Sequence, residues 1–382
     1  MSDEKSVISV LIVDDSAMMR NLIGRMIEDT PGLEVAEKAM NGVFALQKIP
    51  RVNPDIIILD LEMPEMNGIE FLQERKKQGI KIPVVILSSV AEKGAKITMD
   101  ALALGASDFI QKPSGSVSMD IYAVRDTLIP MLFGYGGAYR RSQGKKVVAP
   151  VEFTKKTPSP LAHPDVSSHF SAPARPAEPA EPPTQHRRPG KTNIIAIGIS
   201  TGGPDALRVV FSKLDSDLTV PIVVVQHMPA GFTNEFAKSL DRICPLEVKE
   251  AEDGDAIKNG RILIAQGNKH LEVERKGTGG VVHLSDSPLV SGHRPSADVL
   301  FASVALAYQN NALGVIMTGM GRDGAGQLGT LYKEGSMTLG QDEKSSVVYG
   351  MPRVAYELGH VMEQVSLENM ARRICEIAKT NR

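Results

Sequence analysis

The sequence predicts two α/β domains joined by a linker. Its 382 residues exceed the usual length of one domain, and short runs rich in Val and Ile alternate with segments of helical period in both halves of the chain. Between these halves, residues 136–191 hold 10 of the 24 prolines, and 10 Lys and Arg against 4 Asp and Glu. Such a segment buries too little apolar surface to fold. It therefore predicts a basic, flexible linker between one domain over 1–135 and another over 192–382.

The first domain is predicted to contain five strands alternating with five helices. Each apolar run has the length of one strand and is apolar enough to be buried on both faces. The runs cover 7–13, 33–39, 55–59, 82–88 and 107–111, and the helical segments begin at Ser16, Gly42, Met66, Ala91 and Met119. Because strand and helix alternate, we expect a doubly wound, five-stranded parallel sheet of the flavodoxin type.

Polar residues end several of these predicted strands. They are Asp14, Asp15, Asp60, Ser88 and Lys112. The carboxyl ends of parallel strands share one edge of the sheet, so we expect these side chains to line one crevice. Crowded carboxylates repel one another, and a hard divalent cation such as Mg²⁺ relieves that repulsion. A carboxylate beside such a cation, with a lysine and a hydroxyl to hold oxygens, can accept a phosphoryl group. Taken singly, each residue would be read as a helix cap or a surface charge.

The second domain is predicted to be a doubly wound, mostly parallel α/β domain as well. Its first strand, 193–200, leads through the sequence TGGP into an amphipathic helix over 205–214. Ser200 is therefore expected in the turn before a helix N-terminus, where free N–H groups can hold an anion. The glycines of this turn do not fit the GxGxxG spacing, which disfavours a dinucleotide site.

Two further strand ends carry residues that can activate a serine. The run PIVVVQH ends at His227, and ALGVIMTGMGRDGA carries Asp323 in a glycine-rich turn. If the three meet, His227 takes the proton of Ser200, Asp323 stabilises the imidazolium, and backbone N–H groups hold the oxyanion. Thr201 is an alternative nucleophile. On spacing alone, a helix-cap role for Asp323 and a turn role for Ser200 are equally open.

Four motifs of the first domain resemble the receiver domain of two-component response regulators. They are LIVDDSAMMR, ILDLEMPEMNGIEFL, VVILSS and DFIQKP, and the resemblance covers about residues 7–133. It implies that Asp60 is the phosphoacceptor and that Asp14 and Asp15 hold Mg²⁺ together with Asp60.

The same resemblance implies roles for three other residues. Lys112 would contact the phosphoryl group, Ser88 would move onto it as a switch, and Phe109 would follow that switch. Residues 1–135 contain no histidine, so the phosphodonor has to come from outside this domain. A chemotaxis histidine kinase is the implied partner.

Five motifs of the second domain resemble the C-terminal domain of the chemotaxis protein-glutamate methylesterases, the CheB family. They are GISTGGP, VVVQHMPAGFT, SGHRPSADVLF, VIMTGMGRDGA and QDEKSSVVYGMPR, within about residues 193–378. The resemblance implies that Ser200 is the nucleophile, His227 the general base and Asp323 the triad aspartate. It places Thr201 beside the site and the backbone N–H of Met320 at the oxyanion.

Together the two resemblances imply a phosphorylation-activated hydrolase of chemotaxis adaptation. Its implied substrates are glutamate methyl esters on methyl-accepting chemoreceptors, and the family also deamidates glutamines there. The ester chemistry requires no cofactor. The alternative function is a response regulator whose C-terminal domain only binds a ligand or partner.

Composition restricts the location and the partners. No stretch approaches the roughly 18 consecutive apolar residues of a membrane span, and the N-terminus MSDEKSVISV does not fit a secretory signal. We therefore expect a cytoplasmic protein that is not embedded in a membrane. Residues 192–382 carry 19 Lys and Arg against 22 Asp and Glu, which disfavours a nucleic-acid-binding output domain.

Overall fold

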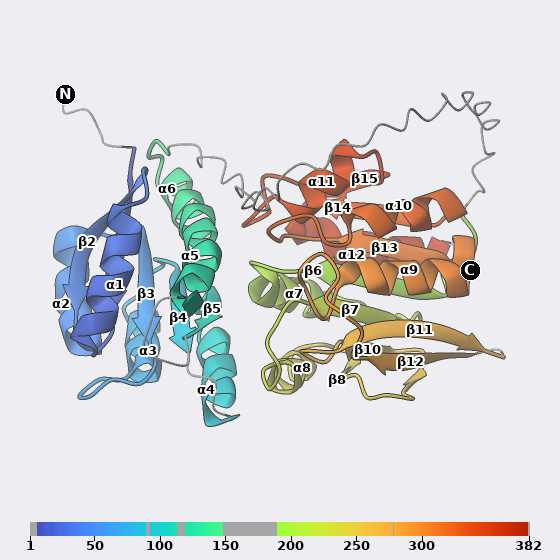
Figure 1. Cartoon of the computed structure of the whole chain (residues 1–382), viewed down its shortest axis with the longest axis horizontal. Helices are drawn as coiled ribbons and strands as arrows, with labels where there is room; N and C mark the ends of the chain where they lie inside the picture. The colour runs from blue at the N-terminus through green and yellow to red at the C-terminus, as the bar shows by residue number, and fades with distance from the viewer. Residues whose placement is uncertain (1–5, 89–91, 113–118, 148–188, 278, 381–382) are drawn as a thin grey trace, which may run out of the picture.

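The structure is a computed structural model that describes residues 6–88, 92–112, 119–147, 189–277 and 279–380. It contains two α/β units side by side, the first coloured blue to green and the second green to red (Figure 1). None of the helices in these ranges is long and apolar enough to cross a lipid bilayer.

The first unit is built on one five-stranded sheet. Its strands are β1 (Ile8–Val13), β2 (Leu33–Ala39), β3 (Ile56–Asp60), β4 (Val84–Ser88) and β5 (Asp108–Gln111). They run parallel in the order β2-β1-β3-β4-β5. The connecting helices are α1 (Ala17–Glu28), α2 (Gly42–Val52), α3 (Gly68–Lys77) and α4 (Glu92–Ala103), and α5 (Met119–Met131) follows the last strand. The predicted flavodoxin-like sheet is confirmed.

Polar caps start the helices just after the strand ends. Ser16 accepts the backbone N–H of Met19 at 3.3 Å at the start of α1. At the start of α3, Asn67 and Glu70 form a reciprocal capping box. Each cap satisfies an N–H group that the first helical turn leaves unpaired. The strand ends and helix starts therefore share the edge of the sheet at which the polar residues were predicted to gather.

The last helix of the first unit continues past residue 135. A π-helical turn (Leu132–Gly136) joins α5 to α6 (Gly137–Ser142). Arg140 of α6 is buried and pairs with Asp55 at 2.8 Å. The predicted domain boundary at 135 thus falls inside a helical segment whose residues pack on the first unit. Within the predicted linker, residues 148–188 lie outside the described residues.

The second unit contains a seven-stranded parallel sheet of order β15-β14-β13-β6-β7-β10-β8. Its strands are β6 (Ile194–Ile199), β7 (Ile222–Gln226), β8 (Glu247–Glu250), β10 (Arg261–Ile264), β13 (Ala312–Ile316), β14 (Met337–Gln341) and β15 (Glu363–Val365). The helices are α7 (Gly203–Phe211), α8 (Thr233–Asp241), α9 (Ala297–Tyr308), α10 (Ala325–Glu334), α11 (Met351–Glu357) and α12 (Leu367–Thr380), with a 3₁₀ turn (Gln309–Asn311) after α9. The predicted mostly parallel α/β domain is confirmed.

Strand β6 shows why both faces of this sheet are covered. Ile195, Ile197 and Ile199 belong to one apolar cluster with α7, α8 and α12. Ile194 and Ala196 point the other way, into a cluster with α9, α10 and α11. Alternate residues of a strand face opposite sides, so a strand covered twice is apolar throughout.

A smaller antiparallel sheet was not predicted. It consists of β11 (His270–Lys276), β12 (Gly279–Ser285) and β9 (Ala256–Ile257). Only scattered residues of it are buried, among them Leu271, Val273 and Val282. The segment therefore lacks the continuous apolar run that marks the strands of the main sheet.

The two units are in contact through the end of the first sheet. Helix α4 packs against α8 of the second unit. The ring of Phe109 in β5 stacks on that of Phe232, with centroids 4.9 Å apart. Its neighbour Asp108 accepts the backbone N–H of Gly202 at 2.8 Å. The contact is therefore both apolar and hydrogen-bonded, and it adjoins the turn that carries Ser200.

Candidate active site and phosphoacceptor crevice

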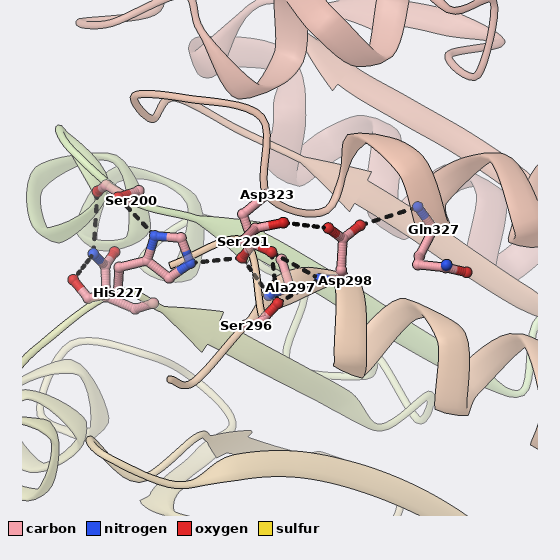
Figure 2. Close-up of polar contacts among 9 residues, drawn as sticks. Ser200, His227, Ser291, Ser296, Ala297, Asp298, Asp323 and Gln327 are labelled. Carbon is pink, nitrogen blue, oxygen red and sulfur yellow. Dashed lines mark hydrogen bonds and ion pairs between the residues drawn. The ribbon is translucent and has the colours of Figure 1, made fainter. Parts of the chain in front are cut away.

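Three strand ends of the large sheet bring Ser200, His227 and Asp323 together (Figure 2). Ser200 follows β6, His227 follows β7, and Asp323 lies in the turn between β13 and α10. Gly202, with φ at 84°, turns the chain after Ser200 into α7. This left-handed backbone conformation favours glycine, because a residue with a Cβ atom would be strained there.

The three side chains form a continuous hydrogen-bonded row. Nδ1 of His227 lies 3.0 Å from Oγ of Ser200, and its Nε2 lies 2.8 Å from Oδ2 of Asp323. Asp323 is 1% exposed and the His227 side chain 8%, whereas Ser200 is half-buried. A base within hydrogen-bond reach of an accessible hydroxyl, and itself oriented by a carboxylate, is an arrangement that can activate a nucleophile.

Asp323 is anchored at the N-terminus of α9. Ser296 donates its hydroxyl to Oδ1 at 2.5 Å, and the N–H of Ala297 donates to Oδ2 at 2.6 Å. Burial alone would raise the pKa of Asp323, but the bonds from His227, Ser296 and Ala297 outweigh it and hold this pKa below its usual value. The carboxylate thus stays charged and fixed, as an imidazolium partner must be.

A second carboxylate, Asp298, lies at the same helix start. Its side chain accepts the N–H of Gln327 at 3.1 Å and the hydroxyl of Ser291 at 3.0 Å. Burial raises the pKa of Asp298, and the negative charge of Asp323 raises it further. Of the two neighbours, Asp323 is therefore the one that ionises more readily.

Gln226 is a supporting residue that sequence reasoning missed. Its side-chain Nε2 donates to the carbonyls of Ser200 and His227, at 3.1 Å each, and so ties the ends of β6 and β7 together. Gly203 leaves the room for this amide, since a Cβ there would collide with Gln226 Oε1. A buried polar residue ending the apolar run VVVQ was the available signal.

Thr201 and Met320 flank the serine. The carbonyl of Thr201 accepts the hydroxyl of Thr318 at 2.9 Å. Gly319, which precedes Met320, lies so close to the serine that a Cβ on it would stand 2.8 Å from Cβ of Ser200. This packing brings the backbone of Met320 near Ser200, and its role as an oxyanion donor stays a prediction.

The polar residues of the first unit gather at the carboxyl edge of its sheet. Nζ of Lys112 lies 2.6 Å from Oδ2 of Asp60 and 3.2 Å from Oδ2 of Asp14. Carboxylate oxygens of Asp14, Asp15 and Asp60 all lie within 4.8 Å of one another. Asp14 and Asp60 are buried, and Asp15 is exposed.

This cluster fits a hard divalent cation. Oδ2 of Asp14 is buried and lies 3.2 Å from Nζ of Lys112, which also pairs with Asp60, so within the described residues one lysine is shared by two of the three carboxylates. Burial raises the pKa of Asp60, and Lys112 only partly offsets that effect. Burial would lower the pKa of Lys112, but the hydrogen bonds and charges of Asp60 and Asp14 raise it. An added cation would stabilise the charged carboxylates, which is the expected effect of Mg²⁺.

The two predicted switch residues lie on the neighbouring strands β4 and β5. Ser88 is buried at the end of β4, with Oγ 2.5 Å from Oγ1 of Thr98, and a small cavity lined in part by Asp60, Ser88 and Gly94 adjoins it. Phe109 stacks on Phe232 of the second unit. The residue expected to follow the switch is thus the one that touches the second unit.

Comparisons with known proteins match both units. The family model "CheB methylesterase" matches residues 195–374, and "Response regulator receiver domain" matches residues 10–120.

Relatives are similar over almost the whole chain. A protein of Treponema denticola named protein-glutamate methylesterase/protein-glutamine glutaminase is 62% identical, over 97% of this chain and 98% of its own length. Proteins of the same name from Treponema pallidum and Halalkalibacterium halodurans are 51% and 42% identical, over 97% and 96% of this chain and 97% of each relative.

Proposed function

The chain belongs to the CheB methylesterase family, with a response regulator receiver domain at its N-terminus, and we propose that it hydrolyses glutamate methyl esters on chemoreceptors. The observation that carries this function is the row formed by Ser200, His227 and Asp323, with contacts of 3.0 Å and 2.8 Å. A domain that only binds a ligand would have no need of a buried carboxylate behind a histidine and a half-buried serine.

The chemistry follows from this row. Oγ of Ser200 attacks the ester carbonyl of the methylated glutamate while its proton passes to Nδ1 of His227, and N–H groups near Ser200, with Met320 the proposed donor, hold the oxyanion. The tetrahedral intermediate collapses and methanol leaves with the proton from His227. Water then attacks the glutamyl-serine ester, again losing its proton to His227, and glutamate is released as Ser200 recovers its proton.

Glutamine deamidation needs no additional group. Ser200 attacks the side-chain amide in the same way, and ammonia leaves in place of methanol with the proton from His227. The family name of the relatives includes this second activity. Thr201, next to the serine, is in this proposal part of the site wall and not the nucleophile, because the hydroxyl that His227 contacts is that of Ser200.

The receiver is proposed to control access to this site. Asp60 accepts the phosphoryl group from a chemotaxis histidine kinase. Asp14, Asp15 and Asp60 would hold Mg²⁺, which when bound would supply positive charge opposite the phosphoryl oxygens. Lys112 and Ser88 hold those oxygens. Phe109 and Asp108 contact the second unit beside Ser200, so rearrangement of Phe109 would weaken this contact. The domains proposed from the sequence are the receiver over 1–135, the linker over 136–191 and the catalytic domain over 192–382, with the first residues of that linker, through Ser142, packed as a helix on the receiver.

The substrates are receptor glutamates that face the cytoplasm, and we propose that the protein works there. Receptor helices are too bulky to reach Ser200 unless the rim around it is accessible. No nucleic-acid partner is proposed, since the second domain has more acidic than basic residues.

Methanol release tests the function directly. Receptor-containing membranes methylated with a radioactive methyl group are expected to release labelled methanol with the wild type, faster after a small phosphodonor and Mg²⁺ are added. Ser200→Ala should release none while keeping the thermal unfolding of the wild type. Methanol at the background rate with both proteins would instead favour a non-catalytic binding domain.

The contact between the domains is expected to depend on pH. Burial raises the pKa of Asp108 to about 7, against the opposing hydrogen bonds from Gly202, Phe109 and Tyr135, and the charge of nearby Asp205 adds to the increase. We expect separation of the units to return Asp108 to water and to remove the charge of Asp205, so the docked state binds a proton more tightly than the separated state. Docking should be strongest below pH 7 and weaken as the pH rises through 7, by about tenfold between pH 6 and 8.

Hydrogen exchange of the full chain measures this dependence. Amides of β5 and of the start of α7 should lose protection between pH 6 and 8 in the wild type, after correction for the intrinsic exchange rate. Asp108→Asn, which resembles the protonated carboxyl, should keep its protection across that range. Equal behaviour of the two proteins would show that Asp108 does not set the pH dependence.

A further inference from the structure

The receiver contacts the second unit at the Ser200 end of the catalytic row. Asp108 accepts the N–H of Gly202, two residues after the serine, at 2.8 Å. Phe109 stacks on Phe232, and helix α4 packs against α8, which begins one residue after that ring. These contacts place the receiver beside the nucleophile.

The other end of the row, at Asp323, is bordered by two exposed turns. The first covers residues 286–293, before α9. Its Ser291 donates a hydroxyl to Asp298 at 3.0 Å, and the N–H of Asp298 donates to Asp323 at 3.3 Å (Figure 2). The second turn carries Arg322, the neighbour of Asp323. Leu289, Ser291 and Arg322 are exposed with both units in place, so this end of the row remains open to a partner while the receiver is docked.

Leu289 presents apolar surface from a turn that is held in place. It is 61% exposed. On one side, the backbone N–H groups of Val290 and His293 donate to each other's carbonyls, at 3.1 Å and 2.9 Å. On the other side, the guanidinium of Arg294 donates to the carbonyl of Asp286 at 2.7 Å. A partner that covers this leucine therefore has little backbone motion to restrict, which favours binding.

Arg322 presents a positive charge from a similarly fixed turn. Gly321 and Gly324, with φ at 86° and 80°, turn the chain on either side of it, and its carbonyl accepts the N–H of Ala325 at 3.1 Å. Its guanidinium makes no hydrogen bond or ion pair with any of the residues that the structure describes. The donors of this side chain are thus available for a carboxylate, which a guanidinium can bind with two parallel hydrogen bonds.

These two side chains define the chemistry of a partner. One helix can present an apolar residue to Leu289 and a carboxylate to Arg322, because residues three or four apart share a face. The proposed reaction itself creates carboxylates, since each ester or glutamine that is hydrolysed leaves a glutamate on the receptor. The catalytic domain as a whole has 19 Lys and Arg against 22 Asp and Glu, so it does not attract acidic partners in general.

We propose that Leu289 and Arg322 form a docking surface for an acidic, amphipathic receptor helix, and that this surface is open in both states of the receiver. The inference rests on the proposed function of Ser200, His227 and Asp323. A docked receiver then keeps Ser200 from a receptor that is already bound, and its release lets the bound helix reach the serine. Phosphorylation therefore changes kcat more than it changes affinity.

Binding to receptor membranes is measured by co-sedimentation of full-length proteins that all carry Ser200→Ala, so that no ester is hydrolysed. This parent protein should bind without any phosphodonor. Leu289→Ala should raise its Kd roughly tenfold, because burial of the leucine is lost. Arg322→Gln should raise the Kd about two- to fivefold, and Arg322→Glu should raise it further, because like charges repel. No binding before phosphodonor is added, or an unchanged Kd in these variants, would overturn the docking surface.

Receptors with glutamine at the modifiable positions separate the effect of charge from that of shape. In the same Ser200→Ala proteins, Arg322→Gln should weaken binding to receptors with glutamates at these positions and leave binding to the glutamine form unchanged. Added salt should reduce the difference, since exposed charges are screened. An equal loss with both receptors would show that Arg322 does not recognise these carboxylates.

Leu306→Ala and Arg353→Gln are matched controls. Leu306 lies on α9 and is 85% exposed, and Arg353 lies on α11, where it pairs with Glu357 at 3.3 Å. Both changes repeat the test substitutions away from the two turns, and both proteins should bind receptors like the parent. A loss as large as that of the test variants would mean that any exposed leucine or arginine acts in this way, and the docking surface would be rejected.

Kinetics with Ser200 intact distinguish binding from chemistry. Leu289→Ala and Arg322→Gln should raise KM for methanol release several-fold and keep kcat within about twofold of the wild type. An alkyl fluorophosphonate should label Ser200 at the same rate in all three proteins. A lower kcat with unchanged KM would overturn the docking role. Absence of labelling and of methanol release in the wild type would overturn the proposed function instead, and the binding assay, which needs no hydrolysis, would still test the docking surface.

Discussion

Replacing Ser200 with alanine is expected to lower kcat for ester hydrolysis by about four to six orders of magnitude. His227→Ala should lower it by a similar factor, because the serine hydroxyl is a weak nucleophile until His227, 3.0 Å away, accepts its proton. The kcat of the double variant should be at most about tenfold lower than that of either single variant. Once either member is lost, the other has no reaction to assist.

Single-turnover methanol release on methylated receptor membranes measures these rates. Asp323→Asn should retain more activity than either variant but still lose orders of magnitude, since an amide no longer stabilises the imidazolium. Asp298→Asn is a matched control, because it changes the other carboxylate at the same helix start and leaves the contact between His227 and Asp323 in place. Losses at Ser200 and His227 that multiply in the double variant would argue against one shared mechanism.

Asp60→Asn is expected to abolish phosphorylation of the receiver and, with it, activation by a phosphodonor. The amide lacks the nucleophilic oxygen that would form the acyl phosphate, and it also removes a negative ligand from the cluster with Asp14 and Asp15. Lys112, 2.6 Å from Asp60 in the wild type, would lose its closest counter-charge. No phosphoryl adduct should form at any concentration of phosphodonor.

Acetyl phosphate with Mg²⁺ is the probe for this prediction. The wild type should give an adduct that is stable in acid and labile in base, and methanol release should increase. Glu62→Gln changes an exposed carboxylate two residues away and should be labelled like the wild type. Persistent labelling of Asp60→Asn would show that the phosphoacceptor is another residue. If the adduct is lost but the phosphodonor still increases methanol release, phosphorylation of Asp60 does not control the esterase.

The main sheets could be predicted because their strands are covered on both faces. Ile56, Ile57 and Ile58 are all fully buried, so β3 is visible in the sequence as an unbroken apolar run. The antiparallel sheet of β11, β12 and β9 has no such run, since charged residues such as Glu274 and Arg275 are exposed between its buried ones. The alternation of apolar and polar residues over so short a span does not distinguish a strand from a loop.

The part of the site that is formed by residues at the ends of strands could be predicted from the sequence. Ser200, His227 and Asp323 each follow an apolar strand. Because the strands of a parallel sheet end at one edge, it could be predicted from the topology that the three residues lie at the same edge. The residues that support them could not be found in this way, because Gln226 and Ser296 act through contacts between segments distant in sequence. For the same reason the contact of Asp108 with Gly202 was not foreseen.

The stacking of Phe109 on Phe232 provides a position at which fluorescence can report on the contact between the domains. The chain contains no tryptophan, so Phe109→Trp would introduce a single indole at the point where the two domains touch. While the domains are docked, that indole would be shielded from water and emit at shorter wavelength, and on separation its emission would shift to the red. The fluorescence of one side chain would then follow opening and closing in real time, under turnover, without any label attached to the receptors.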